Sequence, residues 1–383
     1  MVDKIIFTVT PIFSIPPRCA AAVETWIYQV AKMTRIPNRI VCIKEEGYSD
    51  ITTVSERCSI HRIGFSRIYK RIFQKLTRID PLPYSQRILN VANDFNITDN
   101  SVIVVHNSMK LYRQIRERSP HAKIVMHMHN AYEPKGMDDN VKMLVPSNYL
   151  KDYYQGFLPD ADIAIVPNGT DPYNTDKHHV KINSSELNIP PEKKIVFYAG
   201  RISPEKGLML LLQAFELLIR TRDDIELVVI GDYASKSKGE KGIYQQKIRE
   251  LAKQLGSHCH MLGGIAPEEM HRYYSLADLV VIPSQFQEPF CMVAIEAMRA
   301  GKPVLVSTRG GMIEFVKDKD TGYHLQEPMT PETIAVDIEK TLNNPDLLSI
   351  AHHGKQFVLE NYLWWQVTHK FETVISNWFD CSN

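Results

Sequence analysis

The sequence predicts an α/β protein built of two doubly wound domains. Two observations favour this class: short runs rich in Val and Ile alternate with segments of helical periodicity, and the whole pattern restarts once, after residue 193. The runs are apolar throughout, which is typical of parallel strands buried on both faces. A length of 383 residues and a hydrophobic content of 44% allow two cores of ordinary size.

The predicted strands follow in chain order. In the first half they are KIIFTVT (4–10), NRIVCI (38–43), SVIVVHNS (101–108), KIVMHMHN (123–130), KMLVPS (142–147) and DIAIVPN (162–168); in the second half they are KIVFYAG (194–200), IELVVIGD (225–232), HCHMLG (258–263), ADLVVIPS (277–284) and KPVLVST (302–308). Longer segments with helical periodicity separate them, as in βαβ units.

Four segments are expected from this pattern. Residues 1–167 form the first domain, the polar stretch 168–193 a linker, and residues 194–358 the second domain, while the aromatic-rich segment 359–383 is a helix expected to pack across to the first domain. Ligands of open α/β sheets bind beyond the carboxyl ends of the strands. The expected active site is therefore a cleft between two domains that face each other.

Composition excludes several classes of protein. A formal net charge of +1 gives no general attraction for nucleic acid. The six cysteines show no C-x-x-C spacing, so neither a zinc site nor a disulfide framework is expected. No G-x-G-x-x-G fingerprint is present, which disfavours a dinucleotide dehydrogenase. The first residues do not resemble a signal peptide, and we expect a soluble protein that at most lies on a membrane surface.

The strand ending at Gly200 leads into a pair of cations, Arg201 and Lys206, beside a predicted helix start near Pro204. A helix amino terminus offers free N–H groups and positive potential. Arg binds phosphate oxygens with two hydrogen bonds, and Lys acts as a point charge. This loop is predicted to bind a diphosphate, with a solvated surface loop as the alternative.

The strand ADLVVIPS leads into EPFCMVAIE, in which two glutamates enclose seven uncharged residues. Glu288 precedes a proline and is therefore expected in the loop. The backbone N–H groups of Phe290, Cys291 and Met292 are predicted to form a second anion site at the start of a helix that ends at Ala300. Glu296 lies inside this helix. Like charges repel, so the two carboxylates are expected to bind sugar hydroxyls on either side of a diphosphate, not the phosphate; solvent exposure or pairing with Arg299 is the alternative for Glu296.

Two further strand ends carry weaker signals. The glycines of TRGGMIE (308–314) permit close backbone approach to a ligand. In HMHN, His129 lies at the end of its strand and is expected to face the cleft, whereas His127 is expected to be a core residue. The His-x-His spacing suits a metal, but no third ligand is apparent, so no metal site is predicted.

Residues 61–78, HRIGFSRIYKRIFQKLTR, contain six Lys and Arg residues and no acidic residue. Their spacing among Ile and Phe predicts a basic amphipathic segment. Arg67, Lys70, Arg71 and Lys75 are the candidates for binding an acidic acceptor or an anionic membrane surface. A solvated helix face is the alternative.

The motifs GRISPEKG, EPFCMVAIE and GGMIE, in this order, resemble the nucleotide-sugar domain of the retaining glycosyltransferases of family 4, which have the GT-B fold of two Rossmann-like domains. The segments HMHNA and VPSNYL extend the resemblance into the first domain, which it makes the acceptor-binding domain. Further stretches, among them FTVTPIFSIPPR and GDYASKSKGEK, are similar to those of the family's lipopolysaccharide core transferases.

The resemblance implies transfer of N-acetylglucosamine from UDP-N-acetylglucosamine, with retention and in α-1,2 linkage, to a glucose of the lipopolysaccharide outer core. Arg201 and Lys206 would hold the diphosphate, Glu288 the donor sugar and Glu296 the ribose. By the same resemblance, Gly264 and Ile265 would meet the uracil, the amides of residues 290–292 the distal phosphate, and His129 the donor sugar.

Expectations about cofactors, location and one loop also depend on the resemblance. No metal or other cofactor is required, and the protein is expected in the cytoplasm at the surface of the inner membrane. The first-domain loop often has glycine where this chain has Arg18, Cys19 and Ala20, which leaves its contact with phosphate open. A core transferase using UDP-glucose or UDP-galactose, a UDP-N-acetylglucosamine epimerase and a non-catalytic binding protein are the alternatives.

Overall fold

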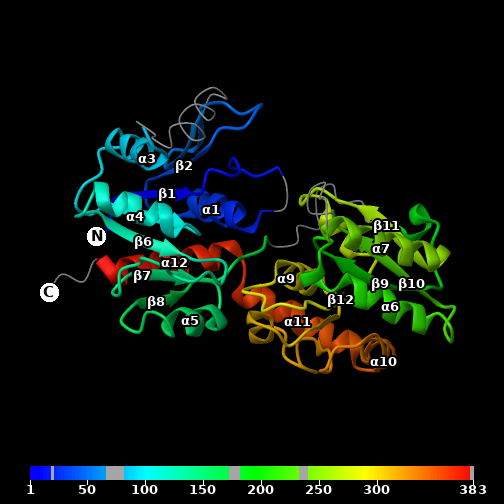
Figure 1. The fold of residues 1–383 in the computed structure, drawn as a ribbon. Coiled ribbons are helices and arrows are strands. Elements are labelled where there is room, and N and C mark those ends of the chain that lie inside the picture. The colour runs from blue at the N-terminus through cyan, green and yellow to red at the C-terminus, as the bar shows by residue number, and fades with distance from the viewer. Residues whose placement is uncertain (19–20, 66–81, 172–181, 233–239, 380–383) are drawn as a thin grey trace. The chain divides into compact units, whose positions relative to one another are not determined.

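The computed structural model describes residues 1–18, 21–65, 82–171, 182–232 and 240–379. The chain forms two compact units, which Figure 1 shows with their elements labelled. The N-terminal unit comprises Met1–Gly169 together with Trp364–Asn383, and the C-terminal unit comprises Thr170–Leu363.

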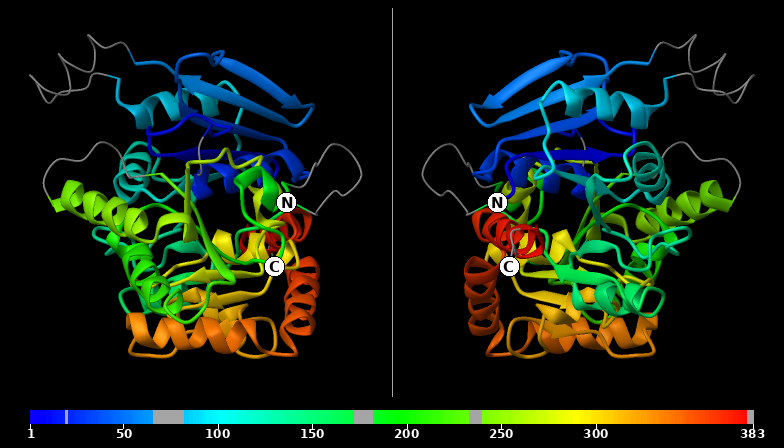
Figure 2. Two further views of the ribbon diagram at one scale, coloured as in Figure 1. Left: turned by 90° about the vertical axis from the view of Figure 1, so that its right-hand side faces the viewer. Right: turned by 90° about the vertical axis from the view of Figure 1, so that its left-hand side faces the viewer.

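The sheet of the N-terminal unit has eight strands in the order β3-β4-β2-β1-β5-β6-β7-β8, all parallel except for the antiparallel pair β3 and β4. They are β1 (Ile5–Val9), β2 (Asn38–Ile43), β3 (Ile51–Ser55), β4 (Cys58–Ile63), β5 (Val102–His106), β6 (Lys123–His127), β7 (Lys142–Val145) and β8 (Asp162–Ile165). The six strands predicted for this half of the chain are confirmed. The hairpin β3–β4, at the sheet edge in Figure 2, was not predicted.

The hairpin escapes prediction because β3 lies at the edge of the sheet. Its residues ITTVS alternate between exposed and partly buried positions, so they form no continuous apolar run. The first residues of the basic stretch, 61–63, belong to β4. Arg62 is buried there and donates to the Ile15 carbonyl oxygen at 2.6 Å, which gives this basic residue a structural role.

Helices cover both faces of this sheet. They are α1 (Ala22–Met33), α3 (Tyr84–Asn93), α4 (Met109–Arg118), α5 (Asn148–Gln155) and α12 (Trp364–Phe379). On one face α1 and α12 pack together, where the rings of Trp26 and Phe371 lie 5.5 Å apart in a T-shaped arrangement. The other face carries α3, α4 and α5, which contribute Ile88, Tyr112 and Leu150 to its core.

The unit boundaries differ from the predicted ones on both sides of the C-terminal unit. The predicted linker 168–193 reaches into that unit, because Ile182 and Ile189 are buried in its core. The predicted closing segment 359–383 divides at Leu363: the residues before it end a helix of the C-terminal unit, and α12 belongs to the N-terminal unit. Ile182 and Ile189 were assigned to a linker because the residues around position 185 are mostly polar.

The sheet of the C-terminal unit is entirely parallel, in the order β11-β10-β9-β12-β13-β14. Its strands are β9 (Lys194–Ala199), β10 (Ile225–Ile230), β11 (Cys259–Gly263), β12 (Leu279–Ile282), β13 (Val304–Val306) and β14 (Tyr323–His324). The five predicted strands are confirmed, and the two-residue β14 was not predicted. The strand order reverses between β9 and β12, and this switch point marks the expected ligand site.

Helices α6 (Leu208–Leu218), α7 (Glu240–Gln254) and α10 (Pro331–Leu342) pack on one face of this sheet, and α8 (Met270–Tyr274), α9 (Met292–Arg299) and α11 (Leu347–Asn361) on the other. Short 3-10 turns complete the unit at η2 (Ser184–Leu187), η3 (Pro204–Lys206), η4 (Gly256–His258) and η5 (Gly311–Glu314). Helix α9 ends at Arg299, one residue before the predicted end at Ala300, which is its C-cap residue. Gly301 beyond it has a φ of +73°, as expected of a glycine that ends a helix.

Replacing Phe371 with Ala is expected to lower the free energy of unfolding of the N-terminal unit by about 3–5 kcal/mol, because it empties a fully buried site between α1 and α12. All four tryptophans lie in this unit, so tryptophan fluorescence during chemical denaturation reports on it selectively. Trp365→Ala on the same helix is the control, since Trp365 is 61% exposed; its cost should stay within about 0.5 kcal/mol. Equal losses in the two variants would contradict the assignment of α12 to this core.

Candidate functional site

The candidate site is built from the loops that follow β9 and β12, the two strands at the switch point of the C-terminal unit. The loops are joined by a hydrogen bond from the Gln285 N–H to the Glu205 carbonyl oxygen at 2.7 Å. Gly207 has a φ of +74°, and a Cβ at this position would overlap the Pro283 carbonyl oxygen. Glycine is therefore required where the chain turns from the 3-10 turn at Pro204–Lys206 into α6.

An ion pair connects the two loops. Lys206 Nζ lies 2.6 Å from Glu288 Oε1, and the Ser284 hydroxyl donates to the same oxygen at 2.6 Å. The Glu288 side chain is only 4% exposed and that of Lys206 20%. The structure thus brings together two predicted site residues that are separated by 82 positions, and adds Ser284, which no sequence signal indicated.

Glu288 is also fixed through its backbone by the loop after β13. Its carbonyl oxygen accepts a hydrogen bond from the Gly311 N–H at 2.7 Å, and a Cβ on Gly310 would overlap that same oxygen. The glycine pair was predicted to allow close approach of a ligand. In the structure the close approach is made to the backbone of Glu288, so the glycines position this carboxylate.

Helix α9 begins at Met292, with Cys291 as its N-cap residue and no capping side chain among the described residues. The free N–H groups of its first turn therefore belong to Met292, Val293 and Ala294. Phe290, named with Cys291 and Met292 in the prediction, precedes the helix, and its ring packs 5.1 Å from that of Phe315. Burial raises the pKa of the Cys291 thiol to about 12, so it stays protonated and unreactive at pH 7.

Glu296 is the single acidic residue of α9, and its neighbours Ile295 and Ala297 are fully buried. The Tyr274 hydroxyl donates to its Oε2 at 2.9 Å. Burial raises the pKa of this carboxyl, against the smaller opposing effects of Tyr274 and Arg299. A partly buried carboxylate with an unsaturated set of hydrogen bonds has free acceptor capacity for ligand hydroxyl groups.

Arg201 and the residues predicted to meet the base lie at the same edge of the sheet. The Arg201 side chain is 65% exposed and its guanidinium lies 3.8 Å from Glu205. Gly264 and Ile265 follow β11, and the Gly264 N–H donates to Asp232 Oδ1 at 3.0 Å. A Cβ on Gly264 would overlap this carboxylate, which explains the glycine.

His129 lies in the N-terminal unit, directly beyond β6. Its backbone N–H donates to Asn107 Oδ1 at 3.0 Å, and its ring Nε2 lies 3.2 Å from His106 Nδ1. Burial lowers the pKa of His129 to about 3, so the ring is neutral at pH 7. His127 is fully buried, as predicted, and its ring lies against Trp26.

The remaining predicted residues either lie outside the described residues or, like Arg18, contact neighbouring protein groups. Arg67, Lys70, Arg71 and Lys75 belong to the segment 66–81, and Cys19 and Ala20 to 19–20, which the structure does not describe. Arg18 stacks on Tyr48, with 4.4 Å from its Cζ to the ring centroid, and donates to the Glu46 carbonyl oxygen. Within the described parts of the chain, no helix is both long and apolar enough to cross a bilayer.

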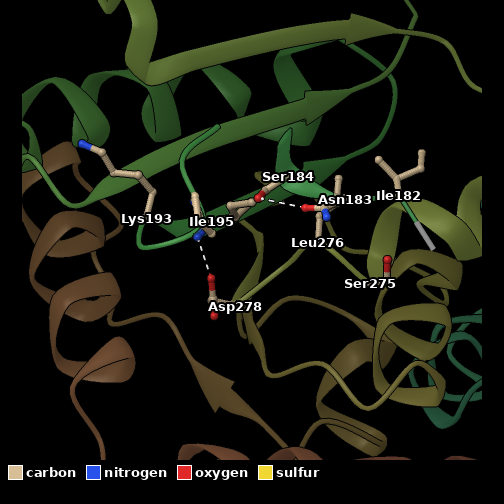
Figure 3. A pocket seen from close by; sticks show the side chains of 9 residues that line it. Ile182, Asn183, Ser184, Lys193, Ile195, Ser275, Leu276 and Asp278 are labelled. Atoms are coloured by element: carbon tan, nitrogen blue, oxygen red, sulfur yellow. Dashed lines mark hydrogen bonds between the residues drawn. The ribbon is translucent and has the colours of Figure 1, made fainter. Parts of the chain in front are cut away.

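A separate pocket of about 370 Å³ opens at the amino ends of β9 and β12 (Figure 3). Its polar lining residues are Asn183, Ser184, Lys193, Ser275 and Asp278. The Asp278 carboxylate already accepts a hydrogen bond from the Ile195 N–H at 2.8 Å, and Lys193 Nζ donates to the Asp223 carbonyl oxygen. These polar groups stabilise the sheet edge, and the pocket lies at the opposite strand ends from the candidate site.

Comparison with known proteins identifies the family. The model of the glycosyl transferases group 1 matches residues 180–356. Over 380 residues the chain is 54% identical to the lipopolysaccharide 1,2-N-acetylglucosaminetransferase of Salmonella typhimurium, an alignment that covers 99% of this chain and 100% of that protein. The chain belongs to the group 1 glycosyltransferases.

More distant members of the family and solved structures agree with this assignment. A D-inositol 3-phosphate glycosyltransferase of Segniliparus rotundus is 31% identical over 219 residues, which cover 55% of this chain and 47% of that protein. Sucrose-phosphate synthase from Thermosynechococcus elongatus superimposes with a TM-score of 0.79 at 20% identity, covering 99% and 100% of the two chains. HepE of Anabaena, solved with UDP and glucose, gives a TM-score of 0.75 at 18% identity over 98% and 100%. This glycosyltransferase therefore has the GT-B fold that its sequence predicts.

Replacing Glu296 with Gln is expected to raise the melting temperature at pH 7. Folding raises the pKa of this carboxyl above its value of 4.5 in the unfolded chain. At a pH above 4.5 the carboxyl therefore lowers the free energy of unfolding, because its ionised form is less favourable in the folded state. The gain should shrink as the pH falls toward and below that value, where wild type is protonated as well. Calorimetry between pH 4 and 8 measures the difference.

The exposed residue Glu268, changed to Gln, is the matched control and should leave the melting temperature unchanged at every pH. If the Glu296→Gln variant is less stable than wild type at pH 7, the prediction is wrong, and the folded protein stabilises the ionised carboxylate of Glu296.

Proposed function

We propose that this glycosyltransferase transfers N-acetylglucosamine from UDP-N-acetylglucosamine, with retention and in α-1,2 linkage, to a glucose of the lipopolysaccharide outer core. The observation that carries the proposal is the 54% identity to the Salmonella enzyme along the whole chain. The arrangement of charges at the switch point supports the use of a donor that contains a diphosphate.

The donor diphosphate is proposed to bind where three sources of positive potential occur together. These are Lys206, the exposed guanidinium of Arg201 and the uncapped first turn of α9. Each would stabilise negative charge that grows on the departing UDP, and groups held in place before reaction do so most effectively. A metal ion at the diphosphate is not needed for this role, and none is part of the proposal.

Glu288 and Glu296 are proposed to bind the two sugars of the donor. The Lys206 ammonium and the Ser284 hydroxyl both contact Oε1 of Glu288, which leaves Oε2 for the hydroxyls of the transferred sugar. Glu296 has Tyr274 on Oε2, and its remaining acceptor capacity suits the ribose. The Lys206–Glu288 pair thus links the group that holds phosphate to the group that holds sugar.

The proposed chemistry needs no carboxylate nucleophile. In a front-face route the acceptor hydroxyl attacks the anomeric carbon from the side on which UDP departs, and a departing phosphate oxygen takes the hydroxyl proton. Glu288 acts as a positioning group, since Lys206 holds its carboxylate. His129 is neutral at pH 7 and has one ring N–H, which we propose meets a hydroxyl of the donor sugar.

The acceptor is proposed to reach the enzyme at the cytoplasmic surface of the inner membrane. The candidates for this contact remain Arg67, Lys70, Arg71 and Lys75 of the basic stretch 61–78. Lipopolysaccharide carries anionic groups and its lipid part stays in the bilayer, so a basic amphipathic segment suits both.

Purified enzyme incubated with truncated core lipopolysaccharide and a panel of UDP- and ADP-sugars is expected to add a single N-acetylhexosamine from UDP-N-acetylglucosamine, as measured by mass spectrometry of the product. Glycosidic linkage analysis should place it at O2 of a glucose in α configuration. Transfer of hexose from UDP-glucose or UDP-galactose would refute the proposed donor, and epimerised donor without acceptor would refute transfer.

Replacing Lys206 with Gln is expected to lower kcat about 10²–10³-fold, because the positive charge beside the leaving group is lost. Gln keeps a hydrogen-bond donor for the buried Glu288 carboxylate, which limits the loss of stability that an Ala would cause. The exposed residue Lys253, changed to Gln on α7, is the matched control and should retain wild-type rates. Wild-type kcat in a correctly folded Lys206→Gln enzyme would contradict the diphosphate assignment.

A further inference from the structure

Three histidines of the N-terminal unit converge at the carboxyl ends of neighbouring strands. His106 ends β5 and His127 ends β6, and the two residues are direct partners in the parallel register. Side chains alternate along an extended chain, so His129, two residues beyond His127, lies on the same face of the sheet. The sequence showed His127-x-His129 without a third ligand, and the sheet register supplies His106.

The distances between these rings suit a shared ion. One nitrogen of each ring can be chosen so that all three lie within 4.8 Å of one another. The closest pair, His106 Nδ1 and His129 Nε2, is 3.2 Å apart. Two imidazole nitrogens bound to one tetrahedral zinc ion at about 2.0–2.1 Å lie about 3.4 Å apart. The third ring, His127, has its centroid 4.0 Å from that of His129.

The protonation states are those of metal ligands. Burial lowers the pKa of all three rings, that of His129 to about 3, so each is neutral at pH 7 and has one nitrogen lone pair. Of the six ring nitrogens, hydrogen bonding among the described residues accounts for two. The other four are buried and have no partner there, including both nitrogens of the fully buried His127.

We propose that His106, His127 and His129 bind one transition-metal ion of the Zn²⁺ class. The ligand set is three imidazoles, which suits zinc and its neighbours in the first transition series and is unsuited to Mg²⁺ and Ca²⁺, which take oxygen ligands. Apolar rings surround the site: Trp26 lies 4.4 Å from His127 between ring centroids, and Phe7 lies 6.2 Å from His106. This wall excludes water and favours a tight complex.

Such an ion would connect the end of β5 to the chain beyond β6. Coordination through Nε2 of His129 would fix the ring proton on Nδ1, which sets the hydrogen-bonding direction of this side chain. The site consists of residues of the N-terminal unit alone and has no part in binding the diphosphate. It shares His129 with the proposed donor-sugar contact, but it does not depend on that contact, because metal binding is measured without donor or acceptor.

The test measures metal binding directly, with enzyme that carries no histidine tag. Protein dialysed against chelator is titrated with Zn²⁺ by calorimetry, and bound zinc is counted after gel filtration by elemental analysis. We expect about one zinc ion per chain and a higher melting temperature with zinc, because the ion binds the folded state preferentially. His127→Gln should lower zinc affinity at least 10-fold and abolish the rise in melting temperature.

His121→Gln is the matched control, since His121 is an exposed histidine of the same unit. It should bind zinc as wild type does. If His127→Gln fails to fold, the ring ¹⁵N signals of wild-type histidines in apo and zinc-treated enzyme serve instead, and three of the fourteen histidines should shift together. No binding by wild type would overturn the proposal. Equal binding by His127→Gln and wild type would overturn it as well, by showing adventitious surface binding only.

Zinc binding is read without donor or acceptor, so it stands or falls separately from transfer. An enzyme that binds zinc at this site and transfers a different sugar would leave the metal proposal intact. An enzyme that transfers N-acetylglucosamine and binds no zinc would overturn the metal proposal alone.

Discussion

The contact between Lys206 and Glu288 connects the loops at the switch point of the C-terminal unit. Lys206 comes from the loop after β9 and Glu288 from the loop after β12, and the loop after β13 holds the Glu288 backbone through Gly311. A buried carboxylate without a partner costs several kcal/mol, so the lysine and the Ser284 hydroxyl are conditions for keeping the Glu288 side chain there, while the Gly311 N–H satisfies the Glu288 backbone carbonyl. The glycines at 207 and 310 follow from the same constraint, because a side chain at either position would separate the loops.

The N-terminal unit is organised around buried rings. Trp26 contacts three histidines and Phe371, and its Nε1 donates to the Pro167 carbonyl oxygen at 3.0 Å. Through this one side chain, helix α1 contacts the carboxyl ends of β5 and β6, the helix α12, and the backbone at Pro167. Neutral histidines fit such a core because each imidazole has apolar faces as well as two polar atoms.

The strand segments and the loops that carry the donor motifs could be predicted because parallel strands are continuously apolar and because Gly and Pro follow them. The carboxylates and cations of the C-terminal unit were chosen as candidates in this way. Partners contributed by distant segments could not be predicted: Ser284 and Tyr274 are ordinary residues until the fold places their hydroxyls beside Glu288 and Glu296. His106 was hidden for the same reason, since only the pairing of β5 with β6 brings it to His127. The edge strand β3 was missed because three of its five residues are exposed.

The place of α12 in the chain has a consequence for folding during synthesis. The C-terminal unit is one continuous segment, Thr170–Leu363, whereas the N-terminal unit takes residues from both sides of it. While the ribosome makes the chain, the sheet of the N-terminal unit emerges first but leaves Val104 and Val125 on a face that Val367 and Phe371 have still to cover. Domains made in order usually fold in order. In this enzyme the C-terminal unit can complete its core before the N-terminal unit does. One apolar face of the N-terminal sheet therefore stays uncovered until α12 has been made.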